Sequence, residues 1–323
     1  MSMSRPPGVF SMKLNSLEPR LLDIVQAEFP LSGEPYAELG QRLGISQDEV
    51  MAHIEKLAAA GIIREIGPVL DSRRLGYQTT LVAMKVSQDY LDKASKIINE
   101  HPGISHGYER EHRFNLWFTL SLPPPADLEA EIQSLSQAIG AETAFSLPVL
   151  KQFKIGTRLG DGSLPQPAEL SATDRRLINE LQNDLPLVPA PFGRMAARLN
   201  MDVAEFLARC QSLLQRGVIR RFGASVNHRE VGFRANAMVC WVAPPEMVDA
   251  AAQRLARLSE VSHCYERKTN PLWQYNLFAM IHGHTREACR EIADWVSRQT
   301  GLEDYVLLFS TREIKKKRVK YLV

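Results

Sequence analysis

Cysteine is scarce in this sequence, and long apolar runs are missing. The 323 residues include four cysteines, at positions 210, 240, 264 and 289, and none of them form a CxxC pair. Neither a disulfide framework nor a structural zinc site is therefore expected. No apolar stretch approaches the roughly 20 residues that a helix needs to cross a bilayer, and the first residues have no apolar core typical of a signal peptide. We therefore expect a cytoplasmic protein without a membrane span.

A strong excess of one charge is also missing. The chain has 39 Lys and Arg against 37 Asp and Glu, a net charge of +2, so its overall charge does not indicate a nucleic-acid-binding protein. Hydrophobic residues make up 45% and charged residues 24%, which is typical of a folded globular chain and excludes extensive disorder. The length suggests two or three domains.

An internal repeat organises the chain. Residues 43–67 realign with residues 199–223 at an offset of 156 (199 minus 43). The matches follow helix-end chemistry: an N-cap, a Glu at the third helical position, and residues that tolerate positive φ. The matched pairs are Ser46 and Asp202, Glu49 and Glu205, Gly61 and Gly217, and Gly44 and Asn200. Duplication explains this pattern better than chance.

The repeat continues beyond these helices. SHGYER (105–110) matches SHCYER (262–267), and FNLWFTL (114–120) matches YNLFAMI (275–281). The two offsets, 157 and 161, differ by four, so the second copy has about four extra residues near 269–272. We expect the two copies to form an internal pseudo-dimer.

Hydrophobic periodicity predicts the same elements in both copies. In the first copy these are helices at 17–28, 36–43 and 47–60, a β segment at 62–70, and then strand 79–86, helix 88–100, strands 105–112 and 113–121, helix 126–139 and strand 142–154. In the second copy, helices are expected near 172–181, 192–199 and 203–216. This order predicts an α+β fold, a tandem repeat of a winged helix-turn-helix and a ferredoxin-like βαββαβ unit.

The expected boundaries are a flexible N-terminus (1–15), winged helix-turn-helix 1 (16–70), ferredoxin-like domain 1 (71–157), a linker (158–169), winged helix-turn-helix 2 (170–226) and ferredoxin-like domain 2 (227–323).

This domain order resembles the Lrp/AsnC family of amino-acid-responsive transcription regulators. In such a regulator the third helix enters the major groove and presents Arg, Lys, Asn or Gln to the bases. Here the corresponding helices begin with acidic residues, Asp48 and Glu49 in the first copy and Asp202 and Glu205 in the second. Phosphate repulsion would oppose docking there. DNA is therefore not an expected partner, and a ligand-responsive DNA-binding regulator is kept as the alternative function.

A second resemblance covers nearly the whole chain. The segments RRFGASVNHREVGFRANAM (220–238), SHCYER (262–267), WQYNLFAMIHG (273–283) and FSTREIKKKRVKYL (309–322) resemble one subunit type of the siroheme decarboxylases. The other subunit type is resembled by REIGPVLDSRRLGY (64–77), YEREHRFNLWFTL (108–120) and LPVLKQFKIG (147–156). The chain thus resembles a fused form of both subunits.

The resemblance implies a carboxy-lyase that removes the acetate carboxylates of rings C and D of siroheme and gives 12,18-didecarboxysiroheme, in haem d1 or alternative haem biosynthesis. It implies siroheme and didecarboxysiroheme as binding partners, with a homodimer of the fused chain as a further assembly. No added cofactor is expected, because siroheme brings its own iron and the sequence has no G-x-G-x-x-G, P-loop or H-E-x-x-H motif. A carrier that binds the tetrapyrrole without reacting is a third possibility.

The repeated hexapeptides supply candidate binding residues. Alternate residues of a strand share a face, which predicts that His106, Tyr108, Arg110 and His112 point one way in the first copy, as do His263, Tyr265 and Arg267 in the second. Arginine binds carboxylates bidentately, and siroheme is ringed by carboxylates. The alternative is a solvated sheet face, since Glu109 and Glu111 make the other side polar too.

The segment after each wing supplies the remaining candidates. Arg73 aligns with Arg229, whereas His228 has Ser72 opposite it, and His112 also has no histidine partner. Since histidine titrates near neutrality, His228 and His112 are the candidate acids or substrate-orienting groups. The candidates for substrate binding are Arg73, Arg110, Arg229, Arg267, Tyr108, Tyr265, His106 and His263. No metal site is expected, because His282 and His284 are more typical of a solvent-facing turn.

Overall fold

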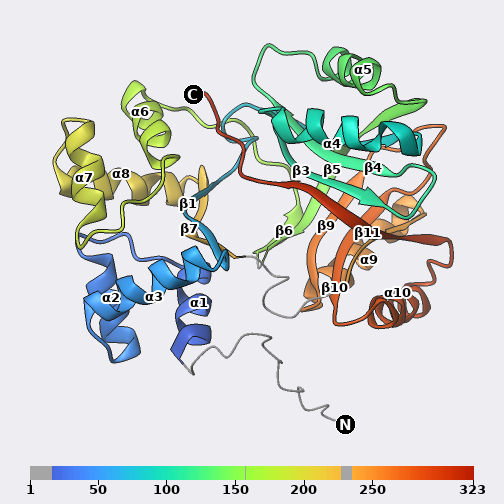
Figure 1. Ribbon diagram of the computed structural model, residues 1–323. Helices are drawn as coiled ribbons and strands as arrows, with labels where there is room; N and C mark the ends of the chain where they lie inside the picture. Colours follow the sequence, from blue (N-terminus) through green and yellow to red (C-terminus); the bar gives the residue numbers. More distant parts are fainter. Residues whose placement is uncertain (1–16, 157, 227–234) are drawn as a thin grey trace, which may run out of the picture. The chain divides into compact units, whose positions relative to one another are not determined.

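The chain divides into two compact units, each built from both copies of the repeat. The computed structural model describes residues 17–156, 158–226 and 235–323 (Figure 1). Of these, residues 17–75, 167–226 and 321–323 form the first unit, and residues 76–156, 158–166 and 235–320 form the second. Within the described residues, none of the helices combines the length and apolar character that a membrane crossing requires.

The first unit consists of two winged helix-turn-helix halves. The first copy supplies α1 (Leu17–Ala27), α2 (Pro35–Leu43), α3 (Gln47–Ala59) and β1 (Ile63–Leu70), and the second supplies α6 (Ala172–Leu181), α7 (Pro191–Arg198), α8 (Val203–Gln215) and β7 (Ile219–Val226). Strands β1 and β7 pair antiparallel, with Gly67 opposite Gly223. The wings of the two copies therefore form one shared two-stranded sheet.

The helix ends match the chemistry predicted from the repeat. Ser46 and Glu49 form a reciprocal capping box at the start of α3. Asp202 is the N-cap of α8, and its side chain accepts from the backbone N–H groups of Ala204 and Glu205. The positions expected to need positive φ adopt it, with 76° at Gly44, 70° at Gly61, 52° at Asn200 and 71° at Gly217.

A carboxylate at equivalent positions ties the helices of each half together. Glu18 is fully buried, 2.7 Å from Nζ of Lys56 and 3.3 Å from Nδ1 of His53. Its counterpart Asp174 lies 2.9 Å from Nη2 of Arg216 and 3.8 Å from Nη1 of Arg209. Burial raises the pKa of Glu18, but the hydrogen bonds and charges of Lys56 and His53 outweigh it and leave that pKa below its ordinary value.

The second unit contains both βαββαβ repeats. Its elements are β2 (Gln78–Lys85), η1 (Gln88–Tyr90), α4 (Leu91–Glu100), β3 (Ile104–Arg110), β4 (Leu116–Leu122), α5 (Leu128–Ile139), β5 (Thr143–Ile155), β6 (Arg158–Gly162), β8 (Ala235–Trp241), α9 (Pro245–Arg257), β9 (Val261–Arg267), β10 (Leu277–Gly283), α10 (Arg286–Thr300) and β11 (Tyr305–Lys316). Strand β6 lies in the segment expected to be the linker.

Two long strands join the repeats into a closed sheet. Strand β5 pairs with β2 through residues 143–148 and then with β9 through 149–155. Strand β11 likewise pairs with β8 through 305–309 and then with β3 through 310–316. Because β5 also reaches β2, the strands β2, β4, β3, β11, β8, β10, β9 and β5 form a ring, and β6 extends from β5. The two repeats thus form the expected internal pseudo-dimer.

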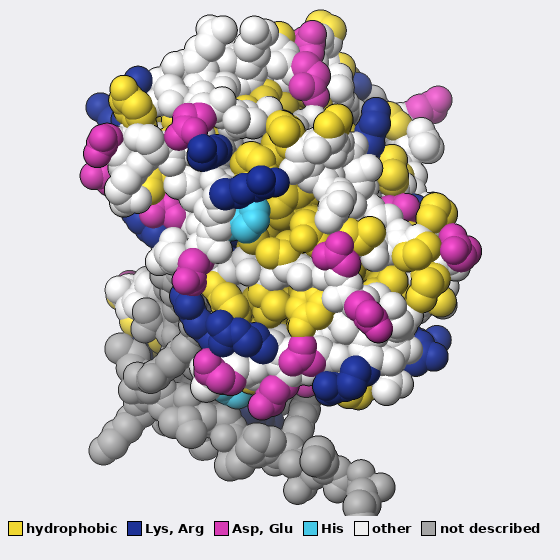
Figure 2. All heavy atoms as spheres, turned by 90° about the vertical axis from the view of Figure 1, so that its right-hand side faces the viewer, with side chains coloured by type: hydrophobic (Ala, Val, Ile, Leu, Met, Phe, Trp, Pro, Cys, Tyr) yellow, Lys and Arg dark blue, Asp and Glu magenta, His cyan; other side chains and the backbone are white. Residues whose placement is uncertain are grey.

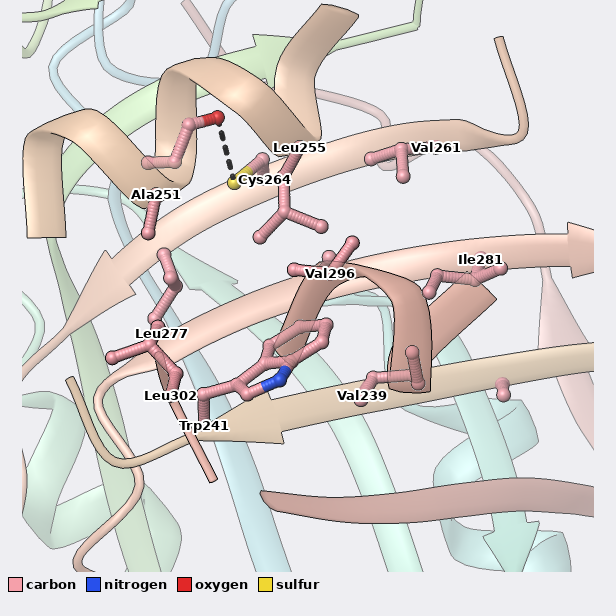
Figure 3. Packing of buried hydrophobic residues seen from close by; sticks show 14 of the residues in the cluster. Val239, Trp241, Ala251, Leu255, Val261, Cys264, Leu277, Ile281, Val296 and Leu302 are labelled. Carbon is pink, nitrogen blue, oxygen red and sulfur yellow. Dashed lines mark hydrogen bonds between the residues drawn. The ribbon is translucent and has the colours of Figure 1, made fainter. Parts of the chain in front are cut away.

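Three apolar cores fill the second unit. Two lie between the sheet and its helices, one per repeat, and the third lines the inner face of the closed sheet. Figure 3 shows the core of the second repeat, in which Val239, Trp241 and Leu277 pack with Leu255 and Val296 of the covering helices. This packing fixes which face of each strand is available inside the ring.

The connection between β3 and β4 is longer than predicted. The sequence predicted strands at 105–112 and 113–121, whereas β3 ends at Arg110 and β4 begins at Leu116. The main chain turns between them, with the N–H of His112 donating to the carbonyl of Arg110 and Asn115 bonding both the N–H and the carbonyl of Val86. His112 therefore lies in the connection and not on the strand.

Candidate functional site

Strands β3 and β9 place their His, Tyr and Arg side chains on the face away from the helices. The intervening residues point to the helices: Glu109 pairs with Arg312, which also reaches Asp92 of α4, and Cys264 contacts the carbonyl of Ala252 in α9 (Figure 3). The predicted alternation along each strand is thus confirmed for His106, Tyr108 and Arg110 and for His263, Tyr265 and Arg267.

Arg110 and Arg267 occupy equivalent positions inside the ring. Nη1 of Arg110 donates to the carbonyl of Leu308 over 2.8 Å, and Nη1 of Arg267 donates to the carbonyl of Leu147 over 2.8 Å. Both carbonyls belong to the long strands next to the point where each strand changes neighbours. Burial lowers the pKa of Arg110 to about 10. The two guanidinium groups therefore stabilise the closed sheet at the places where β11 and β5 change their partner strands.

Tyr108 and Tyr265 lie against these arginines. The guanidinium carbon of Arg110 is 5.3 Å from the Tyr108 ring centroid, and that of Arg267 is 5.0 Å from the Tyr265 ring centroid. Contacts of this length are cation–π interactions, which favour the charged guanidinium in a poorly solvated place. Each repeat thus contributes one paired Tyr–Arg unit to the inner face.

His112 lies in an aromatic cluster at one end of the ring. Its ring is half-buried, 5.5 Å from Trp273, and its Nδ1 accepts from the N–H of Phe114 over 3.1 Å. Burial and the neighbouring charge of Arg113 hold the pKa of His112 below its ordinary value. The acceptor role of Nδ1 leaves Nε2 as the protonated nitrogen of the neutral ring.

The extra residues of the second copy build that cluster. Trp273 follows the four-residue insertion, is only 2% exposed, and has its ring 5.1 Å from those of Trp117 and Tyr275. The first copy has no equivalent insertion in its sequence, so this end of the ring is asymmetric. Figure 2 shows one face of the molecule on which a histidine lies among apolar side chains next to Lys or Arg.

His106 and His263 lie near the other end of their strands. His106 is opposite Lys316 near the end of β11, and His263 is opposite Ile155 at the end of β5. Each histidine Nδ1 is 2.8 Å from the hydroxyl of the preceding serine, Ser105 or Ser262. The structure therefore separates His106 and His263 from His112 by the length of a strand, although the sequence grouped His106 and His112 on one face.

Sequence reasoning missed two residues beside His263. The sequence predicts a solvent-facing turn at His282, but His282 lies on β10, with Nε2 2.6 Å from the Ser262 hydroxyl and Nδ1 2.6 Å from Oδ1 of Asn236. The signal that could have found them is register, since Asn236 and His282 are directly opposite on adjacent strands. Strand pairing between distant segments is not readable from one sequence.

The remaining predicted residues lie elsewhere. Arg73 is in the first unit, in the turn after β1, where its backbone N–H and that of Arg74 donate to Oδ1 of the buried Asp71. His228 and Arg229 lie outside the described residues. Among the residues that the structure describes, no group of three or more His, Cys, Asp or Glu side chains is placed to hold a metal ion.

The helices that a regulator would use on DNA present little free positive charge. Asp48, Glu49, Asp202 and Glu205 are exposed at the starts of α3 and α8. The basic residues Lys56, Arg209 and Arg216 pair with the buried carboxylates of Glu18 and Asp174. Both facts disfavour contact with phosphates.

Comparison with known proteins agrees with this architecture. The family model described as the AsnC-like ligand binding domain matches residues 74–154 and 230–315, and the model of the siroheme decarboxylase NirDL-like HTH domain matches residues 18–64 and 174–220. The fold and the inner-face residues therefore define a tandem protein of helix-turn-helix and AsnC-like domains.

Full-length and half-length relatives identify the family. A siroheme decarboxylase of Hydrogenobacter thermophilus is 40% identical over 316 residues, which is 94% of each chain. The siroheme decarboxylase beta subunit of Methanosarcina barkeri is 41% identical over 151 residues, which is 47% of this chain and 99% of that subunit. The crystal structure of the siroheme decarboxylase NirDL in co-complex with an iron-uroporphyrin III analogue is 38% identical, with a TM-score of 0.74 over 94% of both chains. This chain belongs to the siroheme decarboxylase family.

Proposed function

We propose that this protein is a carboxy-lyase that converts siroheme to 12,18-didecarboxysiroheme in haem d1 or alternative haem biosynthesis. The observation that supports this most is the match to the Hydrogenobacter thermophilus enzyme over 94% of both chains, since it includes both repeats. A protein that shared only the fold with these enzymes would not be expected to match both the alpha and the beta subunit of a two-subunit decarboxylase.

The reaction makes modest chemical demands. In each acetate the bond between the carboxylate carbon and the CH₂ group breaks, CO₂ leaves, and the electron pair stays on the CH₂ carbon, where the macrocycle delocalises it. A proton from a general acid then gives a methyl group, and the acid regains its proton from water. Cations that hold the carboxylates and one imidazole per reacting acetate are sufficient groups for these steps.

Our proposal assigns the acid or orienting role to His228 and His112, in agreement with the unpaired position of each in the repeat. Arg73 and Arg229 are proposed to bind carboxylates. Arg110 and Arg267 donate to backbone carbonyls in this structure, so their proposed contribution is positive potential near the substrate as much as direct contact. Tyr108, Tyr265, His106 and His263 complete the proposed substrate-binding set.

No further cofactor is part of the proposal, because the iron arrives within the substrate. We place the reaction in the cytoplasm. All four cysteines are free and buried, which is compatible with a reducing compartment. Association of two pseudo-dimeric chains into a homodimer is a further part of the proposal.

Anaerobic incubation of the purified chain with siroheme, followed by mass spectrometry, tests the activity. Stepwise loss of two CO₂ masses is expected. Tight binding with an unchanged mass would instead indicate a carrier. An unchanged siroheme spectrum together with a salt-sensitive shift of promoter DNA would indicate a regulator.

A further inference from the structure

The two repeats differ at one pair of facing positions beside the histidines of β3 and β9. In the second copy these positions are Asn236 and His282, directly opposite on β8 and β10. At the repeat offsets of 157 and 161, they correspond to Thr79 and Ser121 in the first copy. Thr79 and Ser121 are also directly opposite, on β2 and β4. The comparison is therefore between equivalent places in one sheet.

In the second copy these residues form a hydrogen-bonded chain with a fixed direction. The amide oxygen of Asn236 only accepts, so Nδ1 of His282 must donate to it. In a neutral ring Nε2 of His282 then accepts, and the single proton of the Ser262 hydroxyl is used for that bond. Ser262 can therefore only accept from His263, whose Nδ1 must be the protonated nitrogen. The chain thus selects the tautomer of His263 in which Nε2 has the lone pair.

The corresponding positions of the first copy carry neither an imidazole nor an amide. The hydroxyls of Thr79 and Ser121 lie 2.9 Å apart, and either can be the donor. Ser105 contacts His106 over 2.8 Å, as Ser262 contacts His263. Without an imidazole and an amide of fixed polarity beyond the serine, this pair does not determine which way the serine hydroxyl points. The tautomer of His106 is consequently not specified in the same manner.

We propose that His282 is a positioning residue which, through Ser262 and with Asn236 as its anchor, fixes the tautomer of His263, and that this makes the two repeats functionally unequal. The role in catalysis rests on the proposed decarboxylase function. A group that orients an imidazole in this way acts by presenting the correct nitrogen. In metal sites the loss of such a group costs about 10- to 100-fold, and we expect an effect of the same order here.

Nitrogen-15 NMR of histidine-labelled protein without siroheme tests the structural step. The wild-type chain should show His263 protonated at Nδ1. The double variant Asn236→Thr with His282→Ser, which transplants the pair of the first copy, should lose this fixed tautomer. In His282→Gln the amide supplies an acceptor oxygen and a donor NH₂ group, so this variant should preserve the tautomer of His263. His284→Gln changes an exposed neighbouring histidine and is the control, which should leave the His263 signal unchanged. A wild-type His263 protonated at Nε2, or a double variant with an unchanged His263 signal, would overturn the proposal.

Turnover of siroheme tests the functional step separately. Because His263 belongs to the proposed substrate-binding set, the double variant should lower kcat/KM for siroheme about 10- to 100-fold, mainly through a higher KM. The single variant His282→Gln should keep most of the wild-type value. An unchanged kcat/KM in a double variant that has lost the tautomer would refute the positioning role. If the wild-type chain does not decarboxylate siroheme at all, the proposed function fails, while the NMR result still decides whether His282 fixes the tautomer.

Discussion

Nη1 of Arg110 donates to the carbonyl oxygen of Leu308 over 2.8 Å and so links β3 to β11 next to the residue where β11 changes its partner strand. The same relationship links Arg267 to Leu147 in β5. Burying a charged group is costly unless it makes hydrogen bonds, and in each of these arginines Nη1 makes one to a main-chain carbonyl. These bonds therefore help to close the sheet, and the same arginines place positive charge on its inner face.

We expect Arg110→Met to destabilise the protein, because it leaves the buried Leu308 carbonyl without this donor. The expected loss is about 1–3 kcal/mol of unfolding free energy, measured by urea denaturation. Arg110→Lys keeps a positive charge and one donor group and should recover part of the loss. Lys268→Ala, an exposed cation beside Arg267, is the control and should have little effect.

Siroheme binding separates this structural role from direct recognition of substrate. If Arg110 contacts a carboxylate, the Kd for siroheme should rise in Arg110→Lys even under conditions where the variant is fully folded. An unchanged Kd in that variant would remove Arg110 from the substrate-binding set and leave its role in the sheet.

The sequence was sufficient for the local part of the fold. Helix caps such as Ser46 with Glu49, and glycines such as Gly61 and Gly217, depend on residues close in the chain, and duplication doubled each signal. The alternation that places Tyr108 and Arg110 on one face is equally local, and the structure confirms it. Prediction by pattern works where the determining contacts are a few residues apart.

Non-local pairing set the limits of that prediction. In the turn that removes His112 from the strand, Asn115, just before β4, bonds to Val86, just after β2. The partner change within β11 and the pairing of Asn236 with His282 join segments from distant parts of the sequence. No single-sequence pattern encodes which strands become neighbours, so the polar chain behind His263 could not be predicted.

Glu18 should make the first unit sensitive to acid. Its pKa in the folded protein is below the ordinary value of 4.5 because Lys56 and His53 outweigh the effect of burial. A lowered folded pKa means that its stabilising contribution is present above the unfolded pKa and is lost as the pH falls through the folded pKa. Glu18→Gln should therefore lower stability at neutral pH and flatten the loss of stability below about pH 4.5, as measured by denaturation across pH. Glu55→Gln, at an exposed position on α3, should retain the wild-type pH profile.

Gly107 should be intolerant of any side chain. A Cβ at this position would lie 2.7 Å from Cγ2 of Ile98, a fully buried residue of α4, so the helix could not keep its present distance from β3. Gly107→Ala is expected to cost about 1–3 kcal/mol, visible as a lower Tm in calorimetry. Gly33→Ala, where nothing lies within 4 Å of the new atom, is the matched control, and equal Tm values for the two variants would contradict this account of the packing.

His112 provides the sharpest test of the proposed catalytic set, because two substitutions separate its ring from its loop. His112→Asn keeps an acceptor where Nδ1 receives the Phe114 N–H, whereas His112→Ala removes both the acceptor and the ring. If the ring acts as an acid or orienting group, both variants should lose about 100-fold or more in turnover, and only His112→Ala should also lose stability. Burial and Arg113 hold the pKa of His112 below its ordinary value of 6.5. This favours the neutral ring, with Nε2 as its donor, at pH 7, and of the two roles proposed for His112 it favours the orienting one. Stability should then fall as the pH is lowered through 6.5 toward the folded pKa, because the unfolded chain binds this proton more readily. That pH dependence should shrink in His112→Asn, and wild-type turnover in His112→Asn would show that the imidazole of His112 takes no part in the reaction.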